Sequence, residues 1–518
     1  MIPGVTGWVV TIALAIQPVF LLYFLLYSSY TLWLIGLSAV EVRRRVAAHS
    51  IEDLDLIDEG DLTKPLTMIV PAFNEEVTIV DSVTRLIQGD YPRFEVVVIN
   101  DGSSDGTLER LRRAFRLRQT DVPYRPAITT ARIRAIYEAA VPLPREVQRL
   151  IVIDKENGGK ADALNAGINA SLCPYFVSLD AGSILAERAL KEMMRVILGS
   201  PGIMAVGGQL AVANGCTVRN GRVVSAGLPA RALPRFQIVE YLRSVTSTQT
   251  GLGQLDSILI LRGACALFEK ETVIRAGGYL TPLLDHRVSR EYVGHRVGAA
   301  CEDVEIVVRL HCFVLDKLQN RRIAFLPHPV AWTEVPETFE SLREQRSRWY
   351  RGLREALRYH RAMLWHSRYG RIGFFVLPAF WLFEYYGPLI ELSAYLSMLF
   401  LLVTELLLGY RVMDYFYLWA FLLASMGSGI LLNILAVVLG AWRFRYGLAD
   451  RVQRQLLPFG RRREVAILLG YAVLESFGYR QLTLYWRLRG LWDAWRGKSG
   501  RERFARSGFH PATAAVDG

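Results

Sequence analysis

Acidic and small polar residues follow three short apolar runs in the middle of the chain. These polar stretches are PAFNEE (71–76), NDGSSDGT (100–107) and SLDAGS (178–183). An aspartate at the tip of a strand, followed by small residues that let the chain turn, is placed to accept hydrogen bonds from a base or a ribose. The structural alternative is that Asp101 forms a turn and Ser104 caps the following helix.

Two stretches point to phosphate and metal chemistry. In KENGGKADALNAG (155–167), two glycines permit close backbone approach, and Lys160 opens a predicted helix whose amide groups and dipole favour phosphate. In SLDAGS, Asp180 is a candidate contact for a metal ion or a ribose hydroxyl, while Gly182 stands where a second acid would often follow. The structural alternative for the glycine and lysine stretch is an ordinary αβ turn. For Asp180 it is a cap on the helix that ILAERAL would form.

Two further stretches carry residues for acid–base chemistry and for sugar binding. ACEDVEIVVRLH (300–311) has paired acids, and one of them, partly buried in a cleft, could take a proton from an attacking hydroxyl. In QRSRWYRG (345–352), Trp349 offers a flat face for a sugar ring and Arg348 a fork for a diphosphate. The structural alternative for the paired acids is that they complement the dipole at the start of a helix. For QRSRWYRG it is an amphipathic helix at the membrane surface.

Alternating strands and helices must position these residues. The runs that read as buried strands are LTMIVPAF, FEVVVIND, RLIVIDKE, YFVSLDAG and IMAVGGQL. Strands that alternate with helices predict an open, mostly parallel α/β sheet, whose ligands bind beyond the carboxyl ends of the strands. The polar residues of the first four runs fall at those ends.

The N-terminal part of the chain predicts a membrane anchor. Residues 8–40 carry no charge, and a helix of that length would reach about 50 Å, more than the roughly 30 Å hydrocarbon core requires. We expect one span, tilted or kinked at Pro18. A cleaved signal peptide is not expected, because no basic region precedes the apolar run. The arginines of EVRRR that follow the run predict a cytoplasmic domain after it.

The C-terminal part predicts a membrane hairpin. Segments 385–408 and 415–442 have spanning length, and residues 442–463 hold seven Arg against one Asp, a cytoplasmic signal. The run 465–479 is short and contains a glutamate, and the sequence leaves open whether it is re-entrant or a third crossing. Segment 371–384 looks like an interfacial helix.

Composition narrows the class of protein. The chain has 518 residues, 52% of them hydrophobic, which suits one large domain plus membrane spans. The net charge is +12, and the basic residues gather beside the apolar stretches. They therefore suit an anionic lipid surface, and we expect no nucleic-acid partner. The five cysteines are irregularly spaced and lack a CxxC pair, which indicates ordinary thiols in a reducing compartment.

Six motifs occur in a fixed order between the predicted membrane segments: PAFNEE, NDGSSDGT, GGK, SLDAG, CED and QRSRW. Together they resemble the motifs of family 2 glycosyltransferases with the GT-A fold. They resemble in particular those of the membrane-embedded processive β-glycan synthases, which make cellulose, hyaluronan, chitin or poly-N-acetylglucosamine. The similarity covers nearly the whole chain and is densest from PAFNEE to QRSRW. It implies an α/β, Rossmann-like GT-A domain on the cytoplasmic side, between N-terminal and C-terminal transmembrane helices.

The resemblance also implies roles for individual residues. Asp303 of CED would be the catalytic base, and Cys301 replaces a residue that is not the proton acceptor. Asp180 would help to hold UDP and its Mg²⁺ or Mn²⁺. The other implied contacts are Phe73, Glu75 and Asp101 around the uridine, Lys160 and Arg348 at the donor diphosphate, and Gln345 and Trp349 at the acceptor sugar.

By this resemblance, the protein transfers sugar with inversion from a UDP-sugar to a growing β-linked polysaccharide, processively and coupled to export. Its partners would be the donor, the polysaccharide, membrane lipids and subunits of an export complex. We expect a multi-pass inner-membrane protein. The expected parts are an anchor (1–42), a cytoplasmic GT-A domain (43–355), interfacial helices (356–384), transmembrane or re-entrant segments (385–486) and a basic tail (487–518).

Three other functions remain open at this point. A transporter without chemistry is one, but it would leave the six motifs unexplained. A non-processive transferase with a lipid acceptor would share the same core. A catalytically weak scaffold subunit of an envelope polysaccharide complex is a different class of protein, and only Gly182 motivates it.

Overall fold

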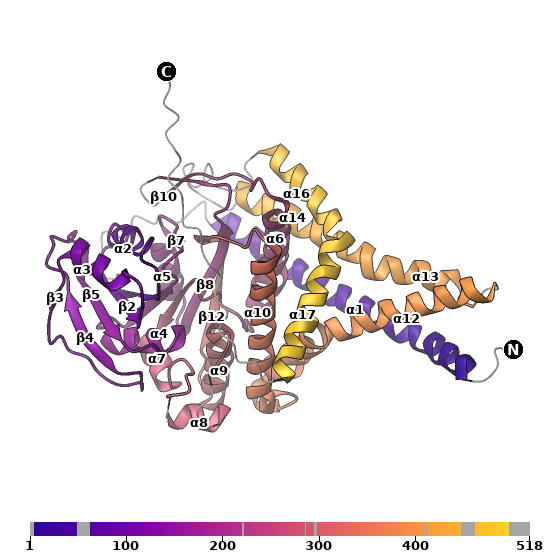
Figure 1. Ribbon diagram of the computed structural model, residues 1–518, viewed down its shortest axis with the longest axis horizontal. Helices are drawn as coiled ribbons and strands as arrows, with labels where there is room; N and C mark the ends of the chain where they lie inside the picture. The colour runs from indigo at the N-terminus through magenta and orange to yellow at the C-terminus, as the bar shows by residue number, and fades with distance from the viewer. Residues whose placement is uncertain are drawn as a thin grey trace, which may run out of the picture.

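In the computed structural model, long apolar helices from both ends of the chain extend together from one side of an α/β domain (Figure 1). The structure describes residues 5–48, 63–219, 222–284, 286–294, 298–409, 412–446 and 461–496. The part of the basic tail beyond 496 and residues 447–460 of the arginine-rich stretch 442–463 lie outside these residues. The α/β domain between apolar helices is the architecture that the sequence predicted.

The domain is built on one ten-stranded sheet with the order β3-β4-β5-β2-β1-β6-β11-β8-β12-β7. Its strands are β1 (Leu66–Ala72), β2 (Phe94–Asp101), β3 (Arg118–Gln119), β4 (Ile133–Glu138), β5 (Val147–Lys155), β6 (Tyr175–Leu179), β7 (Ile184–Leu185), β8 (Ile203–Val212), β11 (Cys265–Glu269) and β12 (Arg322–Thr333). A separate hairpin pairs β9 (Thr217–Arg219) with β10 (Arg222–Ser225). All five predicted strands are present.

The sheet is mixed, so the expectation of a mostly parallel sheet is wrong. The central block β5-β2-β1-β6 is parallel, as predicted. However, β11 runs antiparallel to both of its neighbours, β6 and β8, and the pairs β3/β4, β4/β5 and β7/β12 are antiparallel as well. Because the central strands are parallel, their carboxyl ends meet at one edge, where the polar motifs gather.

Helices cover both faces of the central strands, which explains their continuous apolar runs. Alternate residues of β1 face opposite cores: Met68 packs in one buried cluster and Ile69 in the other. The helices of the domain are α2 (Ile79–Ile87), α3 (Thr107–Phe115), α4 (Lys160–Ala170), α5 (Ala189–Gly199), α6 (Ala232–Ser244), α7 (Lys270–Arg275), α8 (Arg287–Val293), α9 (Glu302–Asp316) and α10 (Phe339–Tyr359). Helix α4 approaches β1 so closely that a Cβ on Gly167 would lie 2.3 Å from Ile69 Cγ2.

Within the described residues, three helices are long and apolar enough to cross a membrane by length and composition: Trp8–Arg44, Gly387–Leu407 and Tyr415–Arg443. The first lies in α1 (Val5–Ala48), which passes through Pro18 as one helix, and the second in α12 (Gly387–Leu408). The third combines α13 (Tyr415–Leu422), a π-helical turn (Leu423–Gly427) and α14 (Ser428–Tyr446). Helices of spanning length therefore stand where the sequence predicted the anchor and the hairpin.

The C-terminal helices lie across the direction of these spans. Segment 465–479 is not among the three spanning helices: it belongs to α16 (Arg462–Leu474) and to a π-helical turn (Glu475–Tyr479), followed by α17 (Arg480–Trp495). Helix α17 packs beside α10, and both run crosswise to α1, α12 and α13 (Figure 1). The expected domain boundaries at 42 and 355 fall inside α1 and α10, which continue to Ala48 and Tyr359.

Candidate active site

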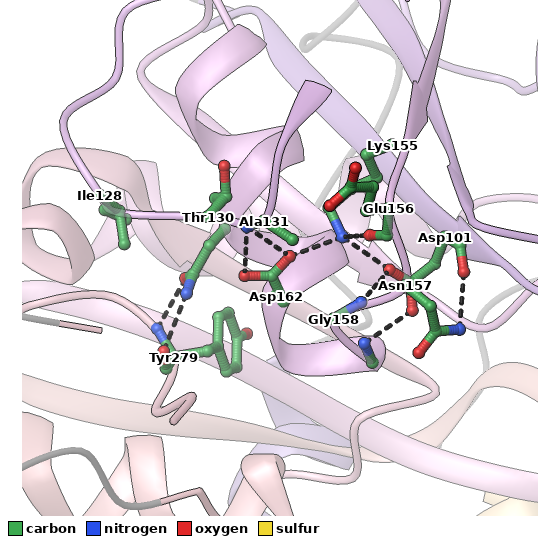
Figure 2. Close-up of polar contacts among 12 residues, drawn as sticks. Asp101, Ile128, Thr130, Ala131, Lys155, Glu156, Asn157, Gly158, Asp162 and Tyr279 are labelled. Carbon is green, nitrogen blue, oxygen red and sulfur yellow. Dashed lines mark hydrogen bonds and ion pairs between the residues drawn. The ribbon is translucent and has the colours of Figure 1, made fainter. Parts of the chain in front are cut away.

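A buried charge network lies at the carboxyl ends of β2 and β5 (Figure 2). Asp101 and Lys155, the last residues of these strands, are paired in register. The Lys155 Nζ atom lies 2.6 Å from Asp101 Oδ1 and 2.5 Å from Asp162 Oδ2. Burial raises the pKa of Asp162, and the nearby Lys155 ammonium opposes that rise. One ammonium therefore holds two buried carboxylates together beneath the edge of the sheet.

Asp101 also shapes the glycine loop that precedes α4. Its Oδ1 accepts a hydrogen bond from the Gly158 N–H (2.9 Å) and its Oδ2 from the Gly159 N–H (2.7 Å). Gly159 has a φ of +88°, a conformation that glycine adopts without strain. The loop then delivers Lys160 to the first position of α4, as predicted. The role of Asp101 as a uracil contact stays a prediction, but its carboxylate clearly positions this loop.

Lys160 joins two of the predicted motifs. Its Nζ atom lies 2.9 Å from Asp180 Oδ1 and 2.7 Å from Glu302 Oε1. Burial alone would lower the pKa of Lys160, but Asp180, Glu302 and Asp303 together raise it. The side chain is therefore a fixed ammonium among three carboxylates. The sequence placed Lys160 near a diphosphate and did not predict its pairing with Glu302.

Asp303 lies in the first turn of α9 and is held by two backbone amides. Its Oδ2 accepts from the Gly263 N–H (3.1 Å) and its Oδ1 from the Val304 N–H (3.0 Å). Burial and the neighbouring Glu302 raise the pKa of Asp303, while Lys160 opposes that rise. An aspartate with a raised pKa, fixed at a cavity wall, is suited to accept a proton.

The predicted QRSRW residues lie on α10, next to a second aromatic side chain. The Trp349 ring lies 6.5 Å from the Tyr241 ring between centroids, and the Arg346 guanidinium lies 4.5 Å over Trp349. The buried Gln345 Oε1 has no hydrogen-bond partner among the described residues. Arg348 is exposed to the cavity, and its charge acts to lower the pKa of Asp303.

A single cavity of about 1070 Å³ brings all the predicted site residues together. Its wall contains Phe73, Glu75, Asp101, Lys160, Asp180, Asp303, Gln345, Arg348 and Trp349. Of these, Glu75 is anchored by its backbone N–H, which donates to Thr107 Oγ1 (2.9 Å). The motifs, which are spread over nearly 280 residues of sequence, therefore form one site.

The same cavity extends to the apolar helices. Tyr23, Tyr27 and Tyr30 of α1 line it, and so does Glu391 of α12. Four ion pairs stand in this part of the wall: Arg243–Glu475 (2.8 Å), Arg346–Glu240 (2.6 Å), Arg480–Glu391 (2.7 Å) and Arg487–Glu384 (3.2 Å). We did not predict these residues as part of a site. A charge within an apolar segment, as at Glu391, is the signal that could have found them.

Two structural alternatives for the motifs do not hold. Helix α3 begins at Thr107, whose N–H donates to Asp105 Oδ1 (3.0 Å), so Ser104 is not its cap. Asp180 does not cap a helix either, because strand β7 follows it and α5 begins only at Ala189.

Comparison with known proteins gives relatives named poly-β-1,6-N-acetyl-D-glucosamine synthase. Poly-β-1,6-N-acetyl-D-glucosamine synthase of Staphylococcus aureus (strain COL) is 26% identical over 342 residues, which cover 65% of this chain and 66% of the relative, just under two thirds. The enzyme of the same name from Staphylococcus epidermidis is 24% identical over 300 residues, 58% of this chain and 57% of the relative.

Among solved structures, a mannosyltransferase from Pyrobaculum calidifontis, in complex with GDP-Man and Mn²⁺, aligns with a TM-score of 0.45 and 17% identity. The alignment covers 92% of this chain and 99% of that one. This structural similarity is too low to support any conclusion about the function of the chain.

A family model gives the assignment directly. The model described as glycosyltransferase like family 2 matches residues 64–352, more than half of the chain. This range begins two residues before β1 and ends within α10, so it contains the sheet and every predicted site residue. The chain therefore belongs to glycosyltransferase family 2 and is a glycosyltransferase.

Proposed function

We propose that the protein transfers sugar, with inversion, from a UDP-sugar to a growing β-linked polysaccharide, and that it does so processively and coupled to export. The single observation that carries this proposal is the shared cavity: Asp303 and Asp180 line one part of it, and Tyr23 and Glu391 of the apolar helices line another. A polymer extended at Asp303 would have a continuous path toward the spans. The curated relatives, named for a poly-N-acetylglucosamine product, support a polysaccharide.

In this proposal, Asp303 accepts the proton of the attacking hydroxyl, which its raised pKa favours. Trp349 stacks on the acceptor sugar and Gln345 offers its unpaired carbonyl oxygen to a sugar hydroxyl. The donor would meet Phe73, Glu75 and Asp101 at the uridine and Lys160, Asp180 and Arg348 at the diphosphate.

We also propose a Mg²⁺ or Mn²⁺ ion held by Asp180 together with Glu302. Among the described residues, no group of three or more His, Cys, Asp or Glu side chains could hold a metal ion. However, oxygens of Asp180 and Glu302 converge on the one Lys160 ammonium, and Mg²⁺ commonly binds one or two carboxylates plus substrate phosphates. An ion there would take the place that the Lys160 ammonium holds in the structure, with Lys160 turned toward the diphosphate. When bound, the ion would supply positive charge against the leaving diphosphate.

Gly182 should weaken this metal site. We expect Gly182→Asp to lower the Mn²⁺ concentration needed for half-maximal activity, because a second carboxylate would follow Asp180. Electron paramagnetic resonance of bound Mn²⁺ in the presence of UDP should show the same shift. Gly199→Asp, at an exposed helix end with open space around its Cα, is the matched control. An unchanged Mn²⁺ requirement would show that Gly182 has no role in metal use.

We place the protein in the inner membrane with the catalytic domain in the cytoplasm. The three spanning helices support a membrane location, and the arginines after α1 support the orientation. Membrane lipids would surround α1, α12 and α13, while α10 and α17 would lie near the surface. Subunits of an export complex would be additional partners.

Product analysis tests the proposal. Purified protein in detergent is given radiolabelled UDP-glucose, UDP-N-acetylglucosamine or UDP-glucuronate with Mg²⁺ or Mn²⁺, and products are sized for the wild type and for Asp303→Asn. We expect a high-molecular-weight product that the substitution abolishes. A single sugar on a lipid would instead identify the non-processive transferase. UDP binding without turnover of any donor would identify the scaffold subunit.

A further inference from the structure

Most cations on the cavity wall are already neutralised by the protein. Among the described residues, seven Lys and Arg side chains line the cavity, and five of them pair with carboxylates: Lys160, Arg243, Arg346, Arg480 and Arg487. The other two, Arg262 and Arg348, have no ion-pair partner within the part of the chain that the structure describes. Arg348 belongs to the predicted donor site, whereas no motif accounts for Arg262.

The chain at Arg262 lies beside the reaction centre. The next residue, Gly263, donates its N–H to Asp303 Oδ2 (3.1 Å) and has its carbonyl oxygen 3.4 Å from Lys160 Nζ. The carbonyl oxygen of Ala264 accepts from the N–H of Asp180 (3.3 Å). The two residues that follow Arg262 therefore border the predicted base, the predicted phosphate lysine and the predicted metal ligand.

The side chain of Arg262 is held in place without being neutralised. Its guanidinium carbon lies 4.1 Å from the centroid of the Tyr241 ring, a cation–π contact that orients the group and leaves its edge free to donate hydrogen bonds. Tyr241 in turn lies next to Trp349, the residue that follows Arg348. Both unpaired guanidiniums line the same cavity as these two rings.

We propose that Arg262 is a second guanidinium contact for the diphosphate of the sugar donor, acting with Arg348. A partly buried guanidinium without a counter-ion favours an anionic ligand, and its planar fork matches phosphate oxygens. The Lys160 ammonium already faces Asp180 and Glu302, so it cannot offset the diphosphate alone. The inference rests on the proposed function, because the diphosphate is the anion that a nucleotide-sugar donor brings to this cavity.

Binding measurements separate this role from others. Isothermal titration of the full-length protein in detergent compares UDP, GDP, uridine and inorganic pyrophosphate, with and without Mn²⁺. We expect Arg262→Gln to weaken UDP and pyrophosphate binding about tenfold or more, since it removes charge-assisted hydrogen bonds, and to leave uridine binding unchanged. Arg262→Lys keeps the charge without the fork, so its affinity should lie between those of the wild type and Arg262→Gln.

A matched control is available in Arg275→Gln. Arg275 also lies over an aromatic ring, that of Phe313 at 5.8 Å, but it does not line the cavity. This variant should bind UDP as the wild type does. Thermal unfolding of both variants shows whether the fold is kept.

The outcomes separate this inference from the proposed function. An equal loss of UDP and uridine affinity in Arg262→Gln, or unchanged UDP binding with a raised KM for an oligosaccharide acceptor, would overturn the role at the diphosphate. If the wild type binds GDP or pyrophosphate but not UDP, and Arg262→Gln weakens that binding, the role of Arg262 holds and the uridine assignment fails. If the wild type binds no diphosphate at all, both proposals fail.

Discussion

Asp303→Asn is expected to reduce turnover by about 10²–10⁴-fold, the usual contribution of a general base. Asparagine has nearly the same shape and can still accept a hydrogen bond from the Gly263 or Val304 N–H, but it cannot take a proton from the acceptor. UDP affinity should change little. Single-turnover transfer of radiolabelled sugar measures the chemical step, and titration calorimetry measures UDP binding.

Asp316→Asn is the matched control for this substitution. Asp316 lies at the other end of α9, where it pairs with Arg368 (3.2 Å) outside the cavity, and its replacement should leave turnover unchanged. Full activity of Asp303→Asn would mean that another group takes the proton.

The pH profile reports on the same carboxyl group. Asp303 accepts a proton only when it is ionised, so the rate should fall as the pH drops through its pKa. Because burial and Glu302 raise that pKa, the fall should begin at a higher pH than for a free aspartate, whose pKa is about 3.9. The residual activity of Asp303→Asn should lack this acidic limb.

Lys155→Met is expected to lower the free energy of unfolding of the α/β domain by about 3–5 kcal/mol. The substitution keeps an apolar chain of similar length but removes the ammonium between Asp101 and Asp162. Two buried carboxylates would then lack a counter-ion. Urea unfolding followed by hydrogen exchange of the amides in β2 and β5 measures the loss within the domain.

Two further variants test this explanation. In Lys155→Met with Asp162→Asn, one of the two orphaned charges is gone, so part of the stability should return. Lys317→Met, at an exposed lysine, should have little effect. Wild-type stability of Lys155→Met would show that the carboxylates find other partners or take up protons at little cost.

The sequence predicted those parts of the fold that local patterns encode. Buried parallel strands are continuous apolar runs, so β1, β2, β5, β6 and β8 were visible. The helix starts at Lys160 and Glu302 were predicted too, because glycines precede the first and paired acids mark the second. The site residues followed from motif order and resemblance.

Strand direction and strand neighbours were not predictable in this way. β11 is an apolar run like the others, and nothing in CALFE shows that it reverses direction between β6 and β8. β12 was not predicted at all, because its sequence, RIAFLPHPVAWT, contains two prolines, which usually argue against a strand. The register of β12 against β8 shifts at Leu326/Pro329 and Pro329/Ala331, which is how the sheet accommodates them.

Pairings between distant charges were also invisible in the sequence. Glu391 and Glu475 stand out in apolar segments, but their partners Arg480 and Arg243 lie 89 and 232 residues away. Buried Lys155 looked like the polar end of a strand, whereas it is the centre of a charge network. Such contacts depend on the tertiary fold, which no local pattern specifies.

The four ion pairs along the cavity have a consequence for energy transduction. Each pair joins one positive and one negative group, so the set carries no net charge. A membrane potential does work on net charge, about 2.3 kcal/mol per elementary charge for each 100 mV. It therefore exerts no net force on these wall groups, nor on an uncharged glycan that passes them. The passage of such a glycan along these pairs is therefore expected to be equally fast whether or not a potential exists across the membrane.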